Sequence, residues 1–218
     1  MTWDFEYTLE FLPLVLRGLV VTVQVTLLGM AIALVVGLFV AVVRRLKIPV
    51  ISQIFSFYVL FVRGTPLLVQ LYVAYYILPD FGIQANAFVT GVIVIGLNYS
   101  SYTAEVYRSG IEGVAVGQWE AAKALSLPPS RLWGQIILPQ GIRAIIPILG
   151  NYLIQMFKDS AVLSAITVVE MMQVALSFGN SNYQYLEPLT VAGLLYVAIS
   201  YPASALIRVL ERRFATTQ

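Results

Sequence analysis

Long apolar stretches separated by short polar segments run along almost the whole chain. They cover about residues 18–43, 53–78, 86–107, 142–175 and 188–208. A helix needs roughly 20 residues to cross the hydrocarbon core of a bilayer, and every stretch reaches that length. The pattern therefore predicts an all-α membrane protein with about five transmembrane helices.

Two of these stretches contain signs of a break. The segment 63–66 (RGTP) interrupts the second stretch, because Pro66 lacks an amide donor and disfavours helix at the residue before it. The fourth stretch is too long for one straight span, so we expect a crossing followed by a second, shorter helix. Non-helical backbone at membrane depth survives only where protein or a water-filled cavity satisfies it. The break at 63–66 therefore indicates a substrate path.

The start of the chain is acidic, with Asp4, Glu6 and Glu10 ahead of the first apolar stretch. A secretory signal begins with a positive region and ends at a small-residue cleavage site, and neither feature is present. We expect residues 1–16 to belong to the mature protein and to form a short helix at the membrane surface.

Composition supports a bilayer protein and argues against several kinds of chemistry. Of the 218 residues, 59% are hydrophobic and 11% are charged, whereas a soluble domain carries about 25% charged residues. The chain has no His and no Cys, which removes imidazole bases, thiolate nucleophiles, disulfides and the usual zinc ligands. A net charge of +2 without a basic run gives no sign of nucleic-acid binding. We expect no catalytic residue, no bound metal and no enzyme activity.

Lysine and arginine are unevenly distributed over the polar connections, which predicts an orientation. The connections around 79–80 and 179–187 contain neither residue. Cytoplasmic loops carry the excess of positive charge in membrane proteins, so we expect the N-terminus outside and the C-terminus in the cytoplasm. Arg63 joins the cytoplasmic cations if its helix begins late. The other cations that this orientation places in the cytoplasm are Arg44, Arg45, Lys47, Arg108, Lys123, Arg131, Arg143, Arg208, Arg212 and Arg213.

A polar segment between the third and fourth apolar stretches has the composition of two short helices. Residues 118–127 are good helix formers that end at Ser126 and the prolines after it. A second helix is expected over 130–138, with Ser130 as its N-cap and a stop before Pro139. From spacing alone, an ordinary amphipathic surface loop and a docking surface for a soluble partner stay equally open.

The spacing within this segment resembles the EAA signature of permease subunits of bacterial ATP-binding-cassette (ABC) importers. The pattern is E-A-A, three residues, a small residue, nine residues and I-x-L-P, and the family usually has Gly where this chain has Ser126. The resemblance implies a cytoplasmic coupling loop over about 112–141 that docks on an ATPase subunit. Its candidate docking residues are Gly117, Glu120, Ala121, Ala122, Ser126, Ile136, Leu138 and Pro139.

Further segments look like the polar amino-acid permeases of the histidine, glutamine, arginine and opine group. They are 63–71 (RGTPLLVQL), 102–111 (YTAEVYRSGI) and 158–162 (KDSAV), the last similar to the group's Lys-Asp-Thr-Ser-Leu. The resemblance covers about residues 15–213, and we treat 1–218 as a single transmembrane permease domain. The opening Met-Thr-Trp-Asp and the overall length are similar to the ectoine/hydroxyectoine permease subunit.

The resemblance implies a type-I importer (MetI-like) transmembrane domain in a bacterial inner membrane, in contact with membrane lipid. A second permease subunit would complete a homo- or heterodimer. An extracytoplasmic solute-binding protein would deliver a small polar zwitterion, either an amino acid or an ectoine-like solute. The chain contains no G-x-x-x-x-G-K-[ST], the loop that cradles phosphates in many ATPases. ATP and Mg therefore belong to a partner ATPase subunit.

Polar residues at membrane depth are the candidates for a substrate path. Ionisable residues there are costly and are functional candidates by default. A zwitterion needs partners of both signs, which Lys158 and Asp159 provide. The alternative is that these two residues pair with each other, and that the Ser and Thr residues only pack against neighbouring helices. The full set is Thr65, Pro66, Leu67, Ser101, Tyr102, Lys158, Asp159 and Ser160.

Three further ionisable residues lie outside this set. Glu105 and Arg108 lie one turn apart at the end of the third span, which predicts a structural salt bridge. Glu170 lies late in the fourth stretch, and the sequence assigns it no role.

The alternative function is an ion-coupled secondary transporter that works without an ATPase subunit. Many transporters of that class show repeated helical halves with matched breaks, and no such repeat is evident here.

Overall fold

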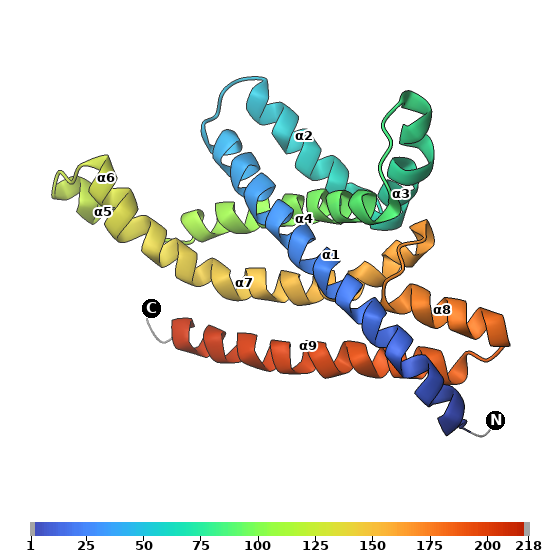
Figure 1. Ribbon diagram of the computed structural model, residues 1–218. Coiled ribbons are helices and arrows are strands. Elements are labelled where there is room, and N and C mark those ends of the chain that lie inside the picture. The colour runs from blue at the N-terminus through green and yellow to red at the C-terminus, as the bar shows by residue number, and fades with distance from the viewer. Residues whose placement is uncertain (1–2, 216–218) are drawn as a thin grey trace.

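Helix α1 is one rod from Phe5 to Arg45 (Figure 1) in the computed structural model, which describes residues 3–215. The Asp4 carboxylate caps it by accepting the first free backbone N–H groups. Phe11 and Val15 are fully buried against α8 and α9. The expected separate short helix over 1–16 is therefore wrong for the described residues, because these residues continue without a break into the first span.

The second apolar stretch is broken, as the sequence predicts. Helix α2 spans Ile51–Gly64, and α3 spans Leu67–Tyr72 and continues through the wide turn Val73–Ile77 and the tight turn Leu78–Phe81. The two halves are bent by 106°. Thr65 and Pro66 have extended backbone at the break, which confirms the interruption.

The remaining spans are long helices. They are α4 (Ala87–Glu112), α7 (Leu138–Asp159) and α9 (Leu186–Ala215). A tight turn over Ser160–Ile166 follows α7 and leads to the shorter α8, Met171–Asn182, which confirms a crossing followed by a second helix. The described residues contain four helices of spanning length, or five spans when the bent pair counts as one.

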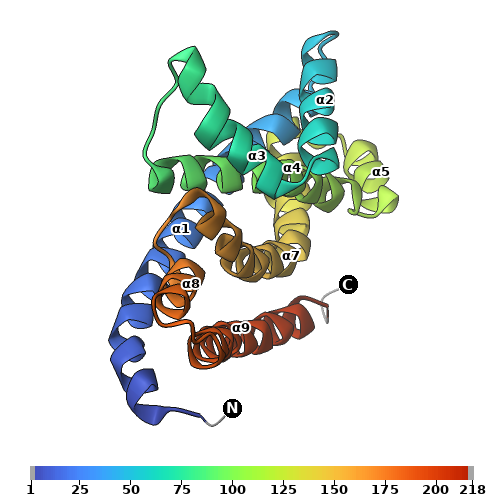
Figure 2. The ribbon, with the colours of Figure 1, turned by 90° about the vertical axis from the view of Figure 1, so that its right-hand side faces the viewer.

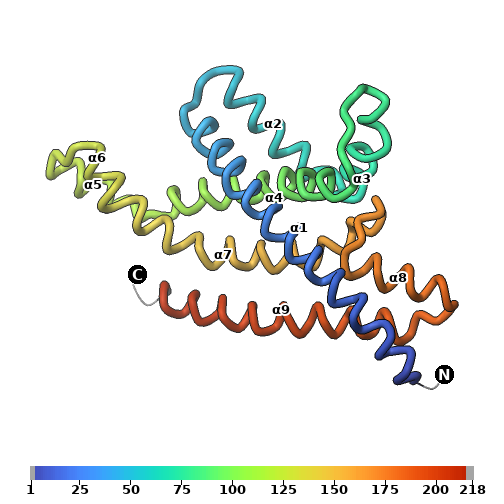
Figure 3. The backbone as a smooth tube through the Cα atoms, viewed as in Figure 1, coloured from blue at the N-terminus to red at the C-terminus, as the bar shows by residue number. Residues whose placement is uncertain are grey.

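Helix α1 contacts α4, α7, α8 and α9 along its length, and the smooth trace in Figure 3 shows it running diagonally across the bundle. Small residues allow the close approach to α4. A Cβ added at Gly37 would lie 2.0 Å from Oγ1 of Thr103, a hydroxyl that donates to the Ala33 carbonyl at 2.7 Å. In the view of Figure 2, α2 and α3 lie on one side of α4 and α7, and α8 and α9 on the other.

Glu170 joins three helices inside the bundle. Its buried carboxylate caps α8 by accepting the backbone N–H groups of Met172 at 2.9 Å and Gln173 at 2.7 Å. It also accepts the hydroxyl of Tyr196 on α9 at 3.2 Å and that of Thr22 on α1 at 3.4 Å. The residue that the sequence leaves unassigned is therefore a structural tie between α1, α8 and α9.

The connections gather at two opposite ends of the bundle (Figure 1). One end holds α5, α6, the α1–α2 connection and the last turns of α9. The other holds the first turns of α1 and the connections that enter α4 and α9. The ten other cations assigned to the cytoplasm lie on the loop and the connection at the first end or on the ends of α1, α4, α7 and α9 that lead to it, whereas Arg63 lies in the last turn of α2 at the broken span.

Candidate functional site

The central polar segment forms a helix, a tight turn and a second helix that runs into a span. Helix α5 covers Val116–Ala124, and α6 covers Pro129–Arg131. The wide turn Leu132–Ile137 then continues directly into α7. The expected stop before Pro139 is wrong, because proline is tolerated in the first turn of a helix, where its amide is not needed. The expected cap at Ser130 is also wrong, since Pro128 precedes the helix and Ser130 lies inside it.

Ser126 makes the turn between these helices with a positive φ of 48°. Its N–H donates to the Lys123 carbonyl at 3.0 Å, and the Leu127 N–H donates to the Ala122 carbonyl at 3.0 Å. This is the Schellman pattern, whose left-handed residue is usually Gly. The structure thus gives a physical reason for the glycine that the EAA signature has at this place.

Aromatic contacts hold the inner face of this loop. The Trp119 ring on α5 meets the Trp133 ring edge to face, with centroids 5.5 Å apart. The guanidinium of Arg45, in the last turn of α1, lies 4.8 Å from the centre of the Trp133 ring. Ala122 is buried. The loop is therefore packed on itself and tied to α1.

The outer face of the loop is open. Gly117, Glu120 and Ala121 are exposed, as are Ser126 and Leu138, while Ile136 and Pro139 are half-buried. Val116 and Leu125 are 70% and 72% exposed, and the sequence motif does not include them. Apolar side chains exposed beside a carboxylate are typical of a surface that a protein partner covers.

A second site lies at the broken span, where a cavity of about 500 Å³ opens. It brings together five residues that the sequence predicts for a substrate path, and six that it does not. The predicted ones are Thr65, Pro66, Leu67, Tyr102 and Asp159; the added ones are Arg63, Gly64, Asn98, Tyr99, Tyr152 and Gln155.

Three predicted residues do not line this cavity. The hydroxyls of Ser101 and Ser160 are buried and each donates to a backbone carbonyl three residues earlier, at 2.7 Å. Lys158 is exposed on another face of α7, because successive residues of a helix do not face the same side. No ion pair joins Lys158 to Asp159 in the described part of the chain.

The cavity holds groups of both charges. Tyr99 Oη donates to Asp159 Oδ2 at 2.6 Å, and Gln155 Nε2 donates to Oδ1 at 3.0 Å, so the carboxylate is oriented by two hydrogen bonds. The guanidinium of Arg63 lies 5.1 Å from the centre of the Tyr102 ring. Arg63, rather than Lys158, is the cation that shares the cavity with Asp159.

Gln70 satisfies the open backbone at the break. Its Nε2 donates to the Val62 carbonyl at 2.9 Å and to Thr65 Oγ1 at 2.7 Å. Its Oε1 accepts from Nδ2 of Asn98 on α4 at 3.0 Å. Residue type alone does not predict this role, because a single amide side chain in an apolar stretch can either pack against a neighbour or hydrogen-bond to open backbone.

Comparisons with known proteins agree on one family. The model of the family described as binding-protein-dependent transport system inner membrane component matches residues 11–216. The probable amino-acid ABC transporter permease protein y4tG of Sinorhizobium fredii is 42% identical over 215 residues, covering 96% of this chain and 93% of the relative. The arginine transport system permease protein ArtQ of Bacillus subtilis is 33% identical over 214 residues, covering 98% of each.

Solved structures agree with the fold. A crystal structure of an amino acid ABC transporter with histidines contains a chain that superposes with a TM-score of 0.93 at 37% identity, covering 98% of this chain and 100% of that one. An inward-facing structure of the MetNI methionine ABC transporter gives a TM-score of 0.69 at 17% identity, a likeness that bears on the fold alone. The expected MetI-like, all-α transmembrane fold is confirmed.

Proposed function

Since the chain belongs to the family of binding-protein-dependent transport system inner membrane components, we propose that it carries an amino acid or a related small zwitterion through the cavity at its broken span. The chain is the membrane-spanning permease subunit of an ATP-driven importer. The observation that carries the proposal is that Asp159 and Arg63 line the same cavity.

The chemistry of the cavity suits a zwitterion. A carboxylate held by Tyr99 and Gln155 offers its remaining lone pairs to a ligand amine. The planar guanidinium of Arg63 suits a ligand carboxylate. Non-helical backbone at Thr65 and Pro66 adds groups that a cavity ligand or water can reach. A volume of about 500 Å³ is in the range typical of small-molecule sites.

Replacing Asp159 with Asn tests this site. Because a neutral amide cannot neutralise a ligand ammonium group, uptake should fall at least about tenfold, mainly through a higher KM. The measurement is uptake of labelled arginine and glutamine into proteoliposomes that hold the complete transporter, its ATPase subunit and its binding protein. The ATPase rate without substrate should stay within about twofold.

Lys158→Gln is the matched control, since it removes a charge from the adjacent residue outside the cavity. It should leave uptake within about twofold of wild type. Normal uptake by Asp159→Asn, or equal losses in both variants, would contradict the assignment of the cavity as the substrate path.

The central loop is the proposed docking surface for the ATPase subunit. Its exposed face combines Glu120 and Ala121 with the apolar Val116 and Leu125, and its inner face is anchored through Trp133. With this loop in the cytoplasm, the N-terminus is outside, in a bacterial inner membrane. ATP and Mg then belong to the ATPase subunit, a solute-binding protein approaches the opposite end, and a second permease subunit completes the pathway.

The kind of zwitterion separates two proposals. The relatives' names concern amino acids, arginine among them, whereas the chain's opening residues and length resemble the ectoine/hydroxyectoine subunit. A thermal-shift screen of the cognate binding protein against amino acids and ectoine distinguishes them. The ion-coupled alternative has no support among these relatives, which are named as ABC permeases.

A further inference from the structure

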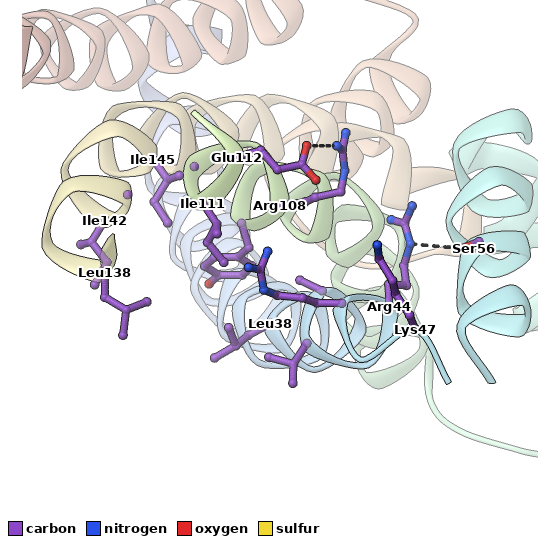
Figure 4. A pocket seen from close by; sticks show the side chains of 16 residues that line it. Leu38, Arg44, Lys47, Ser56, Arg108, Ile111, Glu112, Leu138, Ile142 and Ile145 are labelled. Atoms are coloured by element: carbon purple, nitrogen blue, oxygen red, sulfur yellow. Dashed lines mark hydrogen bonds and ion pairs between the residues drawn. The ribbon is translucent and has the colours of Figure 1, made fainter. Parts of the chain in front are cut away.

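A larger cavity, of about 820 Å³, lies at the end of the bundle that carries the central loop. Figure 4 shows its walls: Leu38, Arg44 and Lys47 come from α1 and the connection after it, and Ser56 from α2. Two further helices, α4 and α7, contribute the residues on the opposite wall. This cavity is distinct from the one at the broken span, with which it shares no lining residue.

The wall of this cavity is apolar and open to the outside. Leu38, Val42 and Ile142 line it and are between 48% and 50% exposed. Its floor is closed where α4 and α7 touch, because a Cβ at Gly141 would lie 3.0 Å from the Gly110 carbonyl oxygen. An apolar hydrocarbon chain that enters from the side would therefore contact these apolar side chains and end at the α4–α7 contact.

The rim is cationic, and part of its charge is already neutralised. Arg44 pairs with Glu105 and also donates to Ser56 Oγ at 3.2 Å. Arg108 pairs with Glu105 at 2.7 Å and with Glu112. The Glu105–Arg108 salt bridge that the sequence predicts is therefore confirmed.

Two rim cations remain outside these pairs. The three ion pairs between described residues do not include Arg45 or Lys47, both of which line the cavity. Arg45 lies over the Trp133 ring, a contact that leaves its positive charge in place. The rim therefore carries an excess of positive charge above an apolar wall.

We propose that this cavity binds an anionic phospholipid, with an acyl chain against Leu38, Val42 and Ile142 and the phosphate at Arg45 and Lys47. Basic pockets between membrane helices recognise anionic headgroups by this combination. A free phosphate would leave the apolar wall unused, and a neutral lipid would leave the cations unpaired. The inference does not depend on the substrate or on the broken span.

Native mass spectrometry of the full chain, purified with its ATPase subunit, measures the bound lipid. The probes are dioleoyl phosphatidylglycerol and dioleoyl phosphatidylcholine, with glycerol phosphate as the soluble headgroup. The wild type should bind phosphatidylglycerol at least about tenfold more tightly than phosphatidylcholine, since each cation near an anionic headgroup strengthens binding about fivefold. Arg45→Gln/Lys47→Gln should lose that preference. Val42→Trp, which narrows the apolar part of the cavity and keeps the cations, should weaken phosphatidylglycerol binding about tenfold.

Arg143→Gln/Arg208→Gln is the matched control, because it removes equal charge from exposed positions at the same end outside the cavity. It should keep the lipid preference within about twofold. Unchanged preference in Arg45→Gln/Lys47→Gln, or glycerol phosphate binding as tightly as the lipid, would overturn the proposal. Lipid retained only by chain freed of the ATPase subunit would do so too, because the subunit would then cover this cavity.

Discussion

A left-handed backbone costs a residue with a side chain about 1–2 kcal/mol relative to its preferred conformations. Ser126 bears this cost in the turn after α5. Ser126→Gly should therefore stabilise the protein by about 1 kcal/mol, which corresponds to a rise in Tm of about 2–4 °C for a chain of this size. Thermal unfolding of the purified chain in detergent measures the change.

Ser130→Gly is the control for Ser126→Gly, because it makes the same substitution at a residue with helical backbone. The variant should lower the stability by about 0.5 kcal/mol. A fall in Tm for both variants would contradict the argument that backbone conformation, rather than the serine side chain, decides the effect at Ser126.

At the scale of elements, the break between α2 and α3 depends on Gln70. Gln70→Leu leaves the Val62 carbonyl and the Asn98 amide without the partners that they have now. Each buried group left without a partner costs about 1–3 kcal/mol, so Tm should fall by several degrees and uptake should decrease. Thermal unfolding and proteoliposome uptake measure the two effects.

Gln53→Leu is the control for Gln70→Leu, because Gln53 is an exposed residue of α2. Its stability should stay within about 0.5 kcal/mol of wild type. Equal stability of both variants would show that the break does not need the Gln70 hydrogen bonds.

Elements controlled by local rules were predictable from the sequence. The break at Pro66 follows from the geometry of proline alone, and the spans follow from the length of the apolar stretches. The start of α1 was not predictable in the same way. Its first turns are held by the burial of Phe11 and Val15 against α8 and α9. These contacts join segments far apart in the chain, so residues 1–16 alone do not predict them.

The cavity at the broken span was predictable only in part, for a related reason. Thr65, Pro66 and Asp159 stand out by residue type, whereas the charge distribution predicts that Arg63 joins the cytoplasmic cations if its helix begins late. At the 106° bend between α2 and α3, Arg63 lines the same cavity as the carboxylate of Asp159, which lies far along the chain. The prediction for Lys158 rests on its charge and its place in the fourth apolar stretch, but helix geometry turns adjacent side chains to different faces.

At the scale of the whole molecule, transport requires the docking loop and the cavity to act together. Glu120→Trp adds bulk to the exposed face of α5 and should disturb docking while the membrane helices stay folded. Uptake should fall at least about tenfold, while ATP hydrolysis by the reconstituted complex stays within about twofold. Both rates are measured in the same proteoliposomes.

Glu120→Gln keeps the size of the side chain and serves as the control, with uptake expected within about twofold of wild type. Normal uptake by Glu120→Trp with its ATPase subunit would show that the subunit docks elsewhere.

Both ends of α1 are fastened to other parts of the chain. At one end, the Asp4 N–H donates to Glu187 Oε1 at the start of α9, at 3.1 Å. At the other, Arg45 lies on the ring of Trp133 in the central loop. The 41 residues between Phe5 and Arg45 make a rod about 60 Å long at 1.5 Å per residue. The central loop and the start of α9, at opposite ends of the bundle (Figure 1), are therefore connected through one continuous helix.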